Sequence, residues 1–134
     1  VRKFVNDSSN YPNNLNMDYY ERSFKLIEQK VDNPIYYIFS EPNTIDNKLK
    51  TYFSNNSCIF ISDLVSNLST ENEFYLMTKC NHYIIANSTF SWWSAWLGEQ
   101  SSKTSIVVAP KIFIDTGPSD WGFDGLIPDR WIQT

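Results

Sequence analysis

The strongest constraint on the fold of this chain is a regular alternation of short apolar runs with segments of helical periodicity. The apolar runs have strand length and lie at residues 35–39, 58–61, 83–86 and 106–109. Helical patterns lie ahead of and between them, at residues 20–31, 44–53, 71–79 and 90–97. Strands separated by helices run parallel with right-handed crossovers, and continuous apolar runs are typical of strands covered on both faces. The pattern therefore predicts an α/β fold with one parallel sheet flanked by helices.

The first helix has recognisable ends. Its apolar side chains recur at helical spacing from Tyr20 to Val31, and Asn16 or Asp18 is in position to cap its amino end. Pro34 then ends the helix, because the residue before a proline is pushed out of the α region.

The aromatic residues of the second half are expected to be mostly core. Trp93 and Trp96 are three residues apart and are predicted to share a helix face, with Trp92 pointing elsewhere. Beyond the last strand the chain loses its periodicity, and we expect this tail to pack back through Trp121 and Trp131.

Composition narrows the functional classes. The 134 residues are enough for one domain with one core. The net charge of -4 and the pI of about 4.8 argue against binding to duplex nucleic acid. Because the overall charge would repel a phosphorylated ligand, such a ligand must be held by a locally positive electrostatic field. No apolar run approaches the roughly 20 residues of a membrane span.

Cysteine and histidine give no metal pattern. Cys58 and Cys80 form no CxxC pair and are interpreted as reduced thiols of a cytoplasmic protein. His82 is the only histidine and is predicted to be a structural, hydrogen-bonded imidazole rather than a general base. Lys111, after the last strand, is expected to be a solvated surface lysine.

The segment between the third strand and the fourth helix is the best candidate for chemistry. Asn87, Ser88, Thr89, Phe90 and Ser91 place small polar side chains at a strand-to-helix turn. A helix amino terminus offers unpaired N–H groups and positive potential, which suit a phosphate group. The loops after parallel strands meet at one edge of the sheet, which is where such folds bind ligands. The simpler alternative is that these side chains only cap the helix. The sequence has no Walker A pattern and no GxGxxG fingerprint.

Residues 74–97 also resemble a known family. The run FYLMTKCNHYIIANSTFSWWSAWL is similar to the signature block of the α-1,2-fucosyltransferases, glycosyltransferase family 11. Weaker similarities follow the family order at residues 18–20, 38–40, 108–111 and 127–132. Together they cover nearly the whole chain and correspond to the second half of a family member.

The resemblance implies a Rossmann-like fold, like the C-terminal domain of a GT-B glycosyltransferase. Residues 1–134 would then be a single domain that binds a nucleotide sugar, a fragment expected to lack the N-terminal acceptor domain and to be inactive alone. The implied reaction is the inverting transfer of L-fucose from GDP-β-L-fucose to a sugar 2-hydroxyl, with no metal or other cofactor. The implied partners are GDP-fucose and a galactose-containing glycan acceptor, in the cytoplasm or at the inner face of the membrane, with peripheral membrane association through lipid-linked acceptors.

The resemblance also assigns residues to roles. Ser88 and Thr89 match the phosphate-proximal motif as diphosphate contacts, with Phe90 as a pocket wall and Asn87 and Ser91 in the same substrate-binding motif.

Outside that motif the match is less complete. Arg2 corresponds to the catalytic arginine of the first family motif, although the expected Gly-Asp does not follow it. Glu41 corresponds to the acidic residue that contacts guanine in the second family motif, but Pro42 replaces the second carboxylate of that motif. Glu73 corresponds to one member of an acidic pair in the family, and the other member is absent. Ser94 replaces a glycine.

Two alternatives belong to other classes of function. These departures favour a degenerate module that binds a nucleotide sugar without catalysis. A carbohydrate-binding module with exposed tryptophans is disfavoured, because such domains are usually rich in β-structure and this pattern is parallel α/β.

Overall fold

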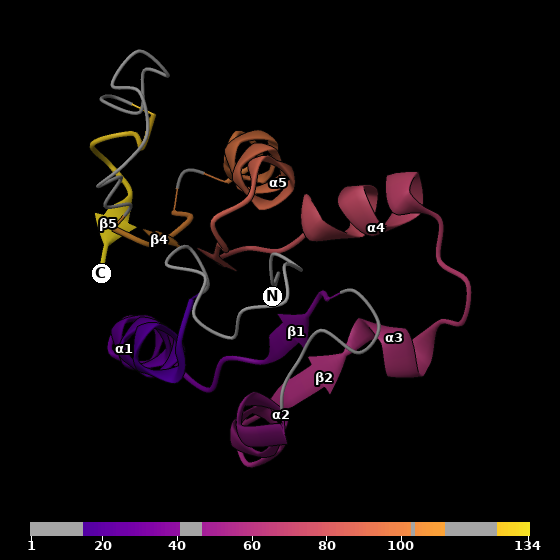
Figure 1. Ribbon diagram of the computed structural model, residues 1–134. Coiled ribbons are helices and arrows are strands. Elements are labelled where there is room, and N and C mark those ends of the chain that lie inside the picture. Colours follow the sequence, from indigo (N-terminus) through magenta and orange to yellow (C-terminus); the bar gives the residue numbers. More distant parts are fainter. Residues whose placement is uncertain (1–14, 41–46, 103, 112–125) are drawn as a thin grey trace, which may run out of the picture.

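Helices and strands alternate along the chain in the computed structural model, which describes residues 15–40, 47–102, 104–111 and 126–134 (Figure 1). The helices are α1 (Met17–Glu28), α2 (Asn47–Ser54), α3 (Ile61–Leu64), α4 (Thr70–Met77) and α5 (Thr89–Glu99). The strands are β1 (Tyr36–Ile38), β2 (Cys58–Phe60), β3 (Tyr83–Ile84), β4 (Val107–Ala109) and β5 (Ile132–Gln133). The predicted α/β class is confirmed, with α4 and α5 on one side of the strands and α1 and α2 on the other.

The strands form two ladders where one sheet was predicted. Strand β1 pairs with β2, and β3, β4 and β5 pair in that order, every pair being parallel. In the described residues no ladder joins β1 to β3. Strand β5 and the short helix α3 were not predicted, because two to four residues are too few to show a periodicity.

Helix α1 follows its sequence pattern closely. The side chain of Asn16 caps its amino end and accepts a hydrogen bond from the Tyr19 amide at 3.2 Å. Tyr20, Phe24 and Ile27 form the buried stripe. The helix ends at Glu28, so Val31 lies beyond it.

The hydroxyl of Tyr19 fixes α1 against both ladders. It donates to the carbonyl oxygen of Ile85 at 2.6 Å and lies 3.3 Å from that of Val108. The same side chain packs in a core cluster with Ile38, the last residue of β1. The carboxyl ends of β1, β3 and β4 therefore meet near the amino end of α1, as parallel order predicts.

Strand β1 is not covered on both faces, contrary to the prediction from its apolar run. Ile35 is 60% exposed and Tyr37 is 48% exposed, whereas Ile38 is buried. Within the described residues the two-sided burial predicted for the strands is met by β4, in which all three residues are buried.

The tryptophans of α5 are arranged differently from the prediction. The rings of Trp92 and Trp96 stack in parallel at 5.4 Å, while Trp93 points outward and is 51% exposed. Trp131 is buried against Trp92 and donates from its indole N–H to Glu99 at 2.9 Å, which confirms that the tail packs back onto α5. Trp121 lies outside the described residues.

Candidate functional site: the turn between β3 and α5

The candidate turn joins a buried strand end to the start of α5. Ala86 is buried, Ser88 is the N-cap in an extended conformation, and Thr89 is the first helical residue. Ser88 makes no side-chain cap hydrogen bond, and Thr89 is exposed. Ser88 therefore holds the N-cap position, and Thr89 does not.

Ser91 anchors the turn from inside. Its buried hydroxyl lies 3.0 Å from the carbonyl oxygen of Ala86 and 2.9 Å from that of Ser88. Ser94 donates in turn to the carbonyl oxygen of Ser91 at 2.9 Å and is fully buried. These contacts fix the backbone of the first helical turn, so the Ser91 hydroxyl holds the shape of the site.

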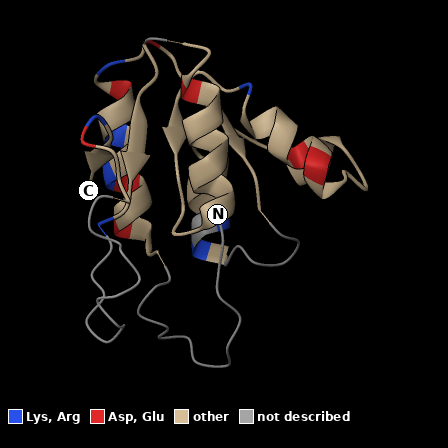
Figure 2. Cartoon of the chain, turned by 90° about the horizontal axis from the view of Figure 1, so that it is seen from above, with Lys and Arg blue, Asp and Glu red and all other residues tan. Residues whose placement is uncertain are grey.

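Phe90 ties the turn to α4. Its ring meets that of Phe74 edge-on, with centroids 5.2 Å apart. Glu73 precedes Phe74 in the first turn of α4 and is partly buried. Ser69 caps that helix, and hydrogen bonds from the backbone and the Ser69 hydroxyl lower the pKa of Glu71. The acidic side chains of α4 gather at its amino end (Figure 2).

The ends of three strands border one cavity beside the turn. A cavity of about 740 Å³ is lined by Phe39, Ile61 and Ala86, each within two residues of the carboxyl end of its strand, and by Ser91 in α5. Its remaining lining is largely apolar. The prediction that these three loops share an edge of the sheet is confirmed by this lining together with the Tyr19 contacts.

Two predicted site residues, Arg2 and Glu41, lie outside the described residues. Lys111 is described and is exposed just after β4, as expected. Lys79 lines the cavity and has its ammonium group 4.5 Å from the centre of the Tyr75 ring.

His82 has the structural role that was predicted. Its Nδ1 accepts the Ile106 amide proton at 3.2 Å, which joins the start of β3 to the residue before β4. This bond requires an unprotonated Nδ1.

The cysteines are free thiols. Burial raises the pKa of the Cys58 thiol to about 11 and also raises that of Cys80. Both are therefore weak nucleophiles at neutral pH. No group of three or more His, Cys, Asp or Glu side chains in the described part of the chain is placed to hold a metal ion.

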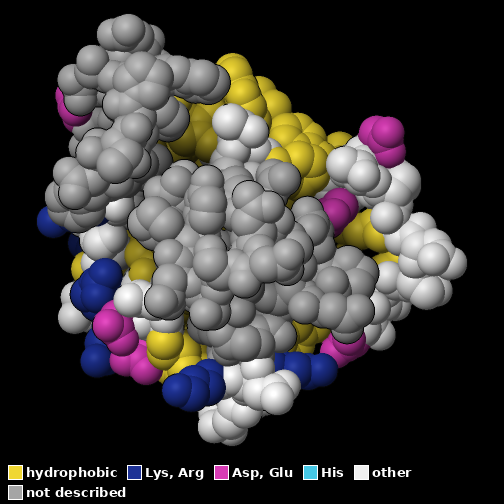
Figure 3. Space-filling view, viewed as in Figure 1, with side chains coloured by type: hydrophobic (Ala, Val, Ile, Leu, Met, Phe, Trp, Pro, Cys, Tyr) yellow, Lys and Arg dark blue, Asp and Glu magenta, His cyan; other side chains and the backbone are white. Residues whose placement is uncertain are grey.

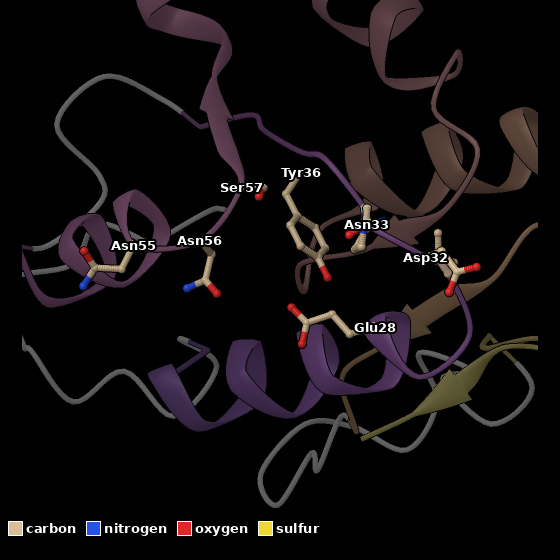
Figure 4. Close-up of a pocket in the computed structure, with 9 residues that line it drawn as sticks. Glu28, Asp32, Asn33, Tyr36, Asn55, Asn56 and Ser57 are labelled. Atoms are coloured by element: carbon tan, nitrogen blue, oxygen red, sulfur yellow. The ribbon is translucent and has the colours of Figure 1, made fainter.

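A polar cavity of about 490 Å³ lies at the opposite end of the strands (Figure 4). Ser57, just before β2, and Tyr36, at the start of β1, place it at the amino ends. The Glu28 carboxylate points toward the Tyr36 hydroxyl, and burial followed by the charge of Glu28 raises the pKa of Tyr36. None of residues 87–91 lines this cavity, so it is not part of the candidate site.

One outer surface of α5 is apolar. Trp93 and Leu97 are exposed there, and hydrophobic side chains gather over α5 on the face shown in Figure 3. None of the described helices is long and apolar enough to cross a membrane.

The sequence of the chain matches one family. The model of glycosyl transferase family 11 matches residues 4–117, and the chain belongs to this family. One relative is the O-antigen biosynthesis glycosyltransferase WbnK of Escherichia coli, 37% identical over 125 residues, which cover 89% of this chain and 36% of the relative. Another is an alpha-1,2-colitosyltransferase of Escherichia coli, 28% identical over 116 residues, which cover 86% of this chain and 38% of the relative.

The chain thus spans little more than a third of the length of these relatives. No solved structure matches it.

Proposed function

We propose that this chain is the donor-binding part of a galactoside α-1,2-fucosyltransferase, with a Rossmann-like domain of the GT-B type. The donor is GDP-β-L-fucose, and the transfer to a sugar 2-hydroxyl proceeds with inversion. The observation that carries the proposal is the turn of residues 87–91, where α5 begins at the carboxyl edge of the strands, beside the cavity that Ala86 and Ser91 line. Membership of family 11 supports the reaction class.

The turn would stabilise the leaving diphosphate. Fucosyl transfer leaves negative charge on GDP as the bond to the sugar breaks, and donors fixed in advance stabilise such charge at little reorganisation cost. The amino end of α5 supplies N–H groups and positive potential, while Ser88 and Thr89 add hydroxyl donors. This local field is needed because the chain carries a net charge of -4.

Other residues of the turn would shape the site. Phe90, held against Phe74, would form a wall of the donor pocket, and Asn87, which precedes the N-cap Ser88, would also contact the donor. Ser91 positions the backbone through its bonds to Ala86 and Ser88.

Three further residues complete the proposed site. Arg2 would neutralise the diphosphate as its charge grows, Glu41 would accept from the N–H groups of guanine, and Glu73 would approach the donor from α4. With these groups in place the reaction would need no metal. The acceptor would be a galactose-containing glycan, reached in the cytoplasm or on a lipid carrier at the inner face of the membrane.

Donor choice is open to a direct test. The complete reading frame that contains this chain would be assayed for transfer to a galactoside from GDP-fucose and from the corresponding GDP-colitose, because one relative is named a colitosyltransferase. Transfer of fucose to the 2-hydroxyl with inverted configuration is the expected result. Preference for colitose would overturn the donor assignment. Binding of GDP without any transfer would favour the degenerate module.

A further inference from the structure

Trp92 joins the first turn of α5 to the described part of the tail, residues 126–134, which is yellow in Figure 1. Its backbone amide donates to the carbonyl oxygen of Ser88 at 3.0 Å. Its indole Nε1 donates to the carbonyl oxygen of Leu126, also at 3.0 Å. One residue therefore bonds the N-cap through its backbone and the tail through its side chain.

The tail is itself attached to the strands. Strand β5 pairs with β4, and the Thr134 amide donates to the carbonyl oxygen of Ala109 at 3.1 Å. Ile127, the residue after Leu126, packs against the core cluster formed by β3, β4 and α5. The bond from Trp92 to the tail therefore connects the first turn of α5 to the far side of the three-stranded ladder.

Three consecutive residues hold the first turn of α5 by three different partners. Phe90 packs against Phe74 of α4, and the Ser91 hydroxyl bonds to the backbone of the turn. Trp92 bonds to Leu126 of the tail. Consecutive residues of an α-helix are about 100° apart around its axis, so the three contacts lie on different sides of the helix. Together they fix the direction of its amino end.

We propose that Trp92 is a positioning residue of the donor site, acting through its bond to the Leu126 carbonyl. The first amides of a helix have no acceptor within that helix, so they are available to the donor diphosphate. Donors stabilise the leaving group well only when they already point at the place where its charge develops. The inference rests on the proposed function, because the direction of these amides matters to the reaction only if they bind the diphosphate.

A second indole bond joins the tail to the other end of the same helix. Trp131 donates from its Nε1 to the Glu99 carboxylate at 2.9 Å. Glu99 is the last residue of α5, roughly 10 Å along the helix axis from Trp92. A hydrogen bond to a charged group is usually stronger than one to a carbonyl, so the loss of this bond should destabilise the fold no less. The two tryptophans therefore separate attachment of the tail from orientation of the turn.

The test removes each indole N–H separately from the complete enzyme. Trp92→Phe and Trp131→Phe each keep an aromatic ring and remove one bond between α5 and the tail. Melting temperature, the affinity for GDP by calorimetry and the kcat of transfer would be measured on the same preparations, well below the melting temperature of each variant.

We expect both variants to melt at a lower temperature and only Trp92→Phe to impair the site. A catalytic group displaced by about 1 Å can cost up to a hundredfold in rate, so a loss of roughly tenfold in kcat is expected for Trp92→Phe, with weaker binding of GDP. Trp131→Phe should leave kcat and GDP affinity near the wild-type values.

An isosteric pair of variants keeps the proposal testable if a phenylalanine variant fails to fold. Phenylalanine is smaller than tryptophan and leaves a gap in the aromatic cluster. 3-Benzothienylalanine at position 92 or 131 keeps the bicyclic shape and replaces the N–H group by a sulfur atom that cannot donate. The same difference between the two positions is expected, with a smaller loss of stability.

Equal effects at the two positions on kcat and GDP affinity would overturn the proposal, because a purely structural bond acts through stability alone. Unchanged transfer in both Trp92 variants would overturn it as well. The proposed function is judged on the wild-type enzyme: absence of GDP binding and of transfer from any GDP-sugar would overturn the function and the inference together. If wild type transfers colitose instead of fucose, the same difference between positions 92 and 131 would still support the positioning role.

Discussion

The hydroxyl of Tyr83 occupies the space that a side chain on Gly98 would need. A Cβ atom built on Gly98 would lie 1.8 Å from that oxygen and 2.9 Å from the carbonyl oxygen of Thr78. The hydroxyl is itself fixed, because it donates to the Cys80 carbonyl oxygen at 2.6 Å. The close approach of α5 to β3, on which the geometry of the turn depends, therefore requires glycine at position 98.

Replacement of Gly98 by alanine should destabilise the protein. Alanine favours the helix by about 1 kcal/mol, but the forced shift of Tyr83 or of the backbone costs about 1–3 kcal/mol and usually more than offsets this gain. Chemical denaturation would measure the free energy of unfolding. Leu97→Ala, at a neighbouring exposed position, is the control and should change it little. Equal stability of Gly98→Ala and wild type would show that α5 can move away from β3 freely.

The bond from Tyr19 to the strand ends should contribute measurably to stability. Tyr19→Phe keeps the ring and removes the donor to Ile85, leaving a buried carbonyl with one partner fewer. We expect a loss of about 1 kcal/mol in the free energy of unfolding. Tyr75→Phe is the matched control, because that tyrosine is 59% exposed, and it should be neutral. Equal values for the two variants would contradict the role given to Tyr19.

The contacts of Gly98 and of Tyr19 could not be predicted from the sequence, whereas more local features could. Helix α1 was predictable from the spacing of Tyr20, Phe24 and Ile27 and from Asn16, because capping and amphipathicity are local. The turn was predictable for the same reason, since small polar residues follow an apolar run. The Tyr19 bonds span 66 and 89 residues, and no local pattern encodes such partners.

The pairing of the strands into two ladders could not be predicted from the sequence either. The apolar runs predicted strands, but pairing depends on which edges meet in space. Strand β5 is two residues long and gains its order from β4, with Trp131 buried beside it. In the site, the donor roles of Arg2, Glu41 and Ser88 rest on family resemblance, whereas the N-cap position of Ser88 and the hydrogen bonds of Ser91 are seen in the structure.

Alkaline pH should weaken the fold through Cys58. Its ordinary pKa is 9.0, and burial raises the value to about 11 in the folded chain, so the folded state holds its proton more tightly than the unfolded state. The contribution is fully present below pH 9 and is lost as the pH rises through 11. Thermal unfolding followed from pH 8 to 11 should show a steeper loss of stability for wild type than for Cys58→Ala. Parallel curves would show that the Cys58 thiol titrates alike in both states.

The sharpest test of the turn is Thr89→Val in the complete enzyme. Valine keeps the shape and removes the hydroxyl. If Thr89 contacts the donor diphosphate, the lost bond to a charged group is worth about 1.5–3 kcal/mol, or roughly a tenfold to hundredfold loss in donor affinity or transfer rate. Thr89 is exposed and is not the N-cap, so the melting temperature should change little. Calorimetry with GDP and a transfer assay on the same preparation would measure both.

Ser91→Ala is the matched comparison within the same helical turn. Its hydroxyl bonds to the Ala86 and Ser88 carbonyls, so its removal should lower the melting temperature, and weaker donor binding should accompany that loss of order. The two variants thus separate ligand contact from support of the backbone. A lowered melting temperature with unchanged transfer in Thr89→Val would remove Thr89 from the donor site. Ser88 would then lose its assignment as well, because both rest on a phosphate held at the amino end of α5.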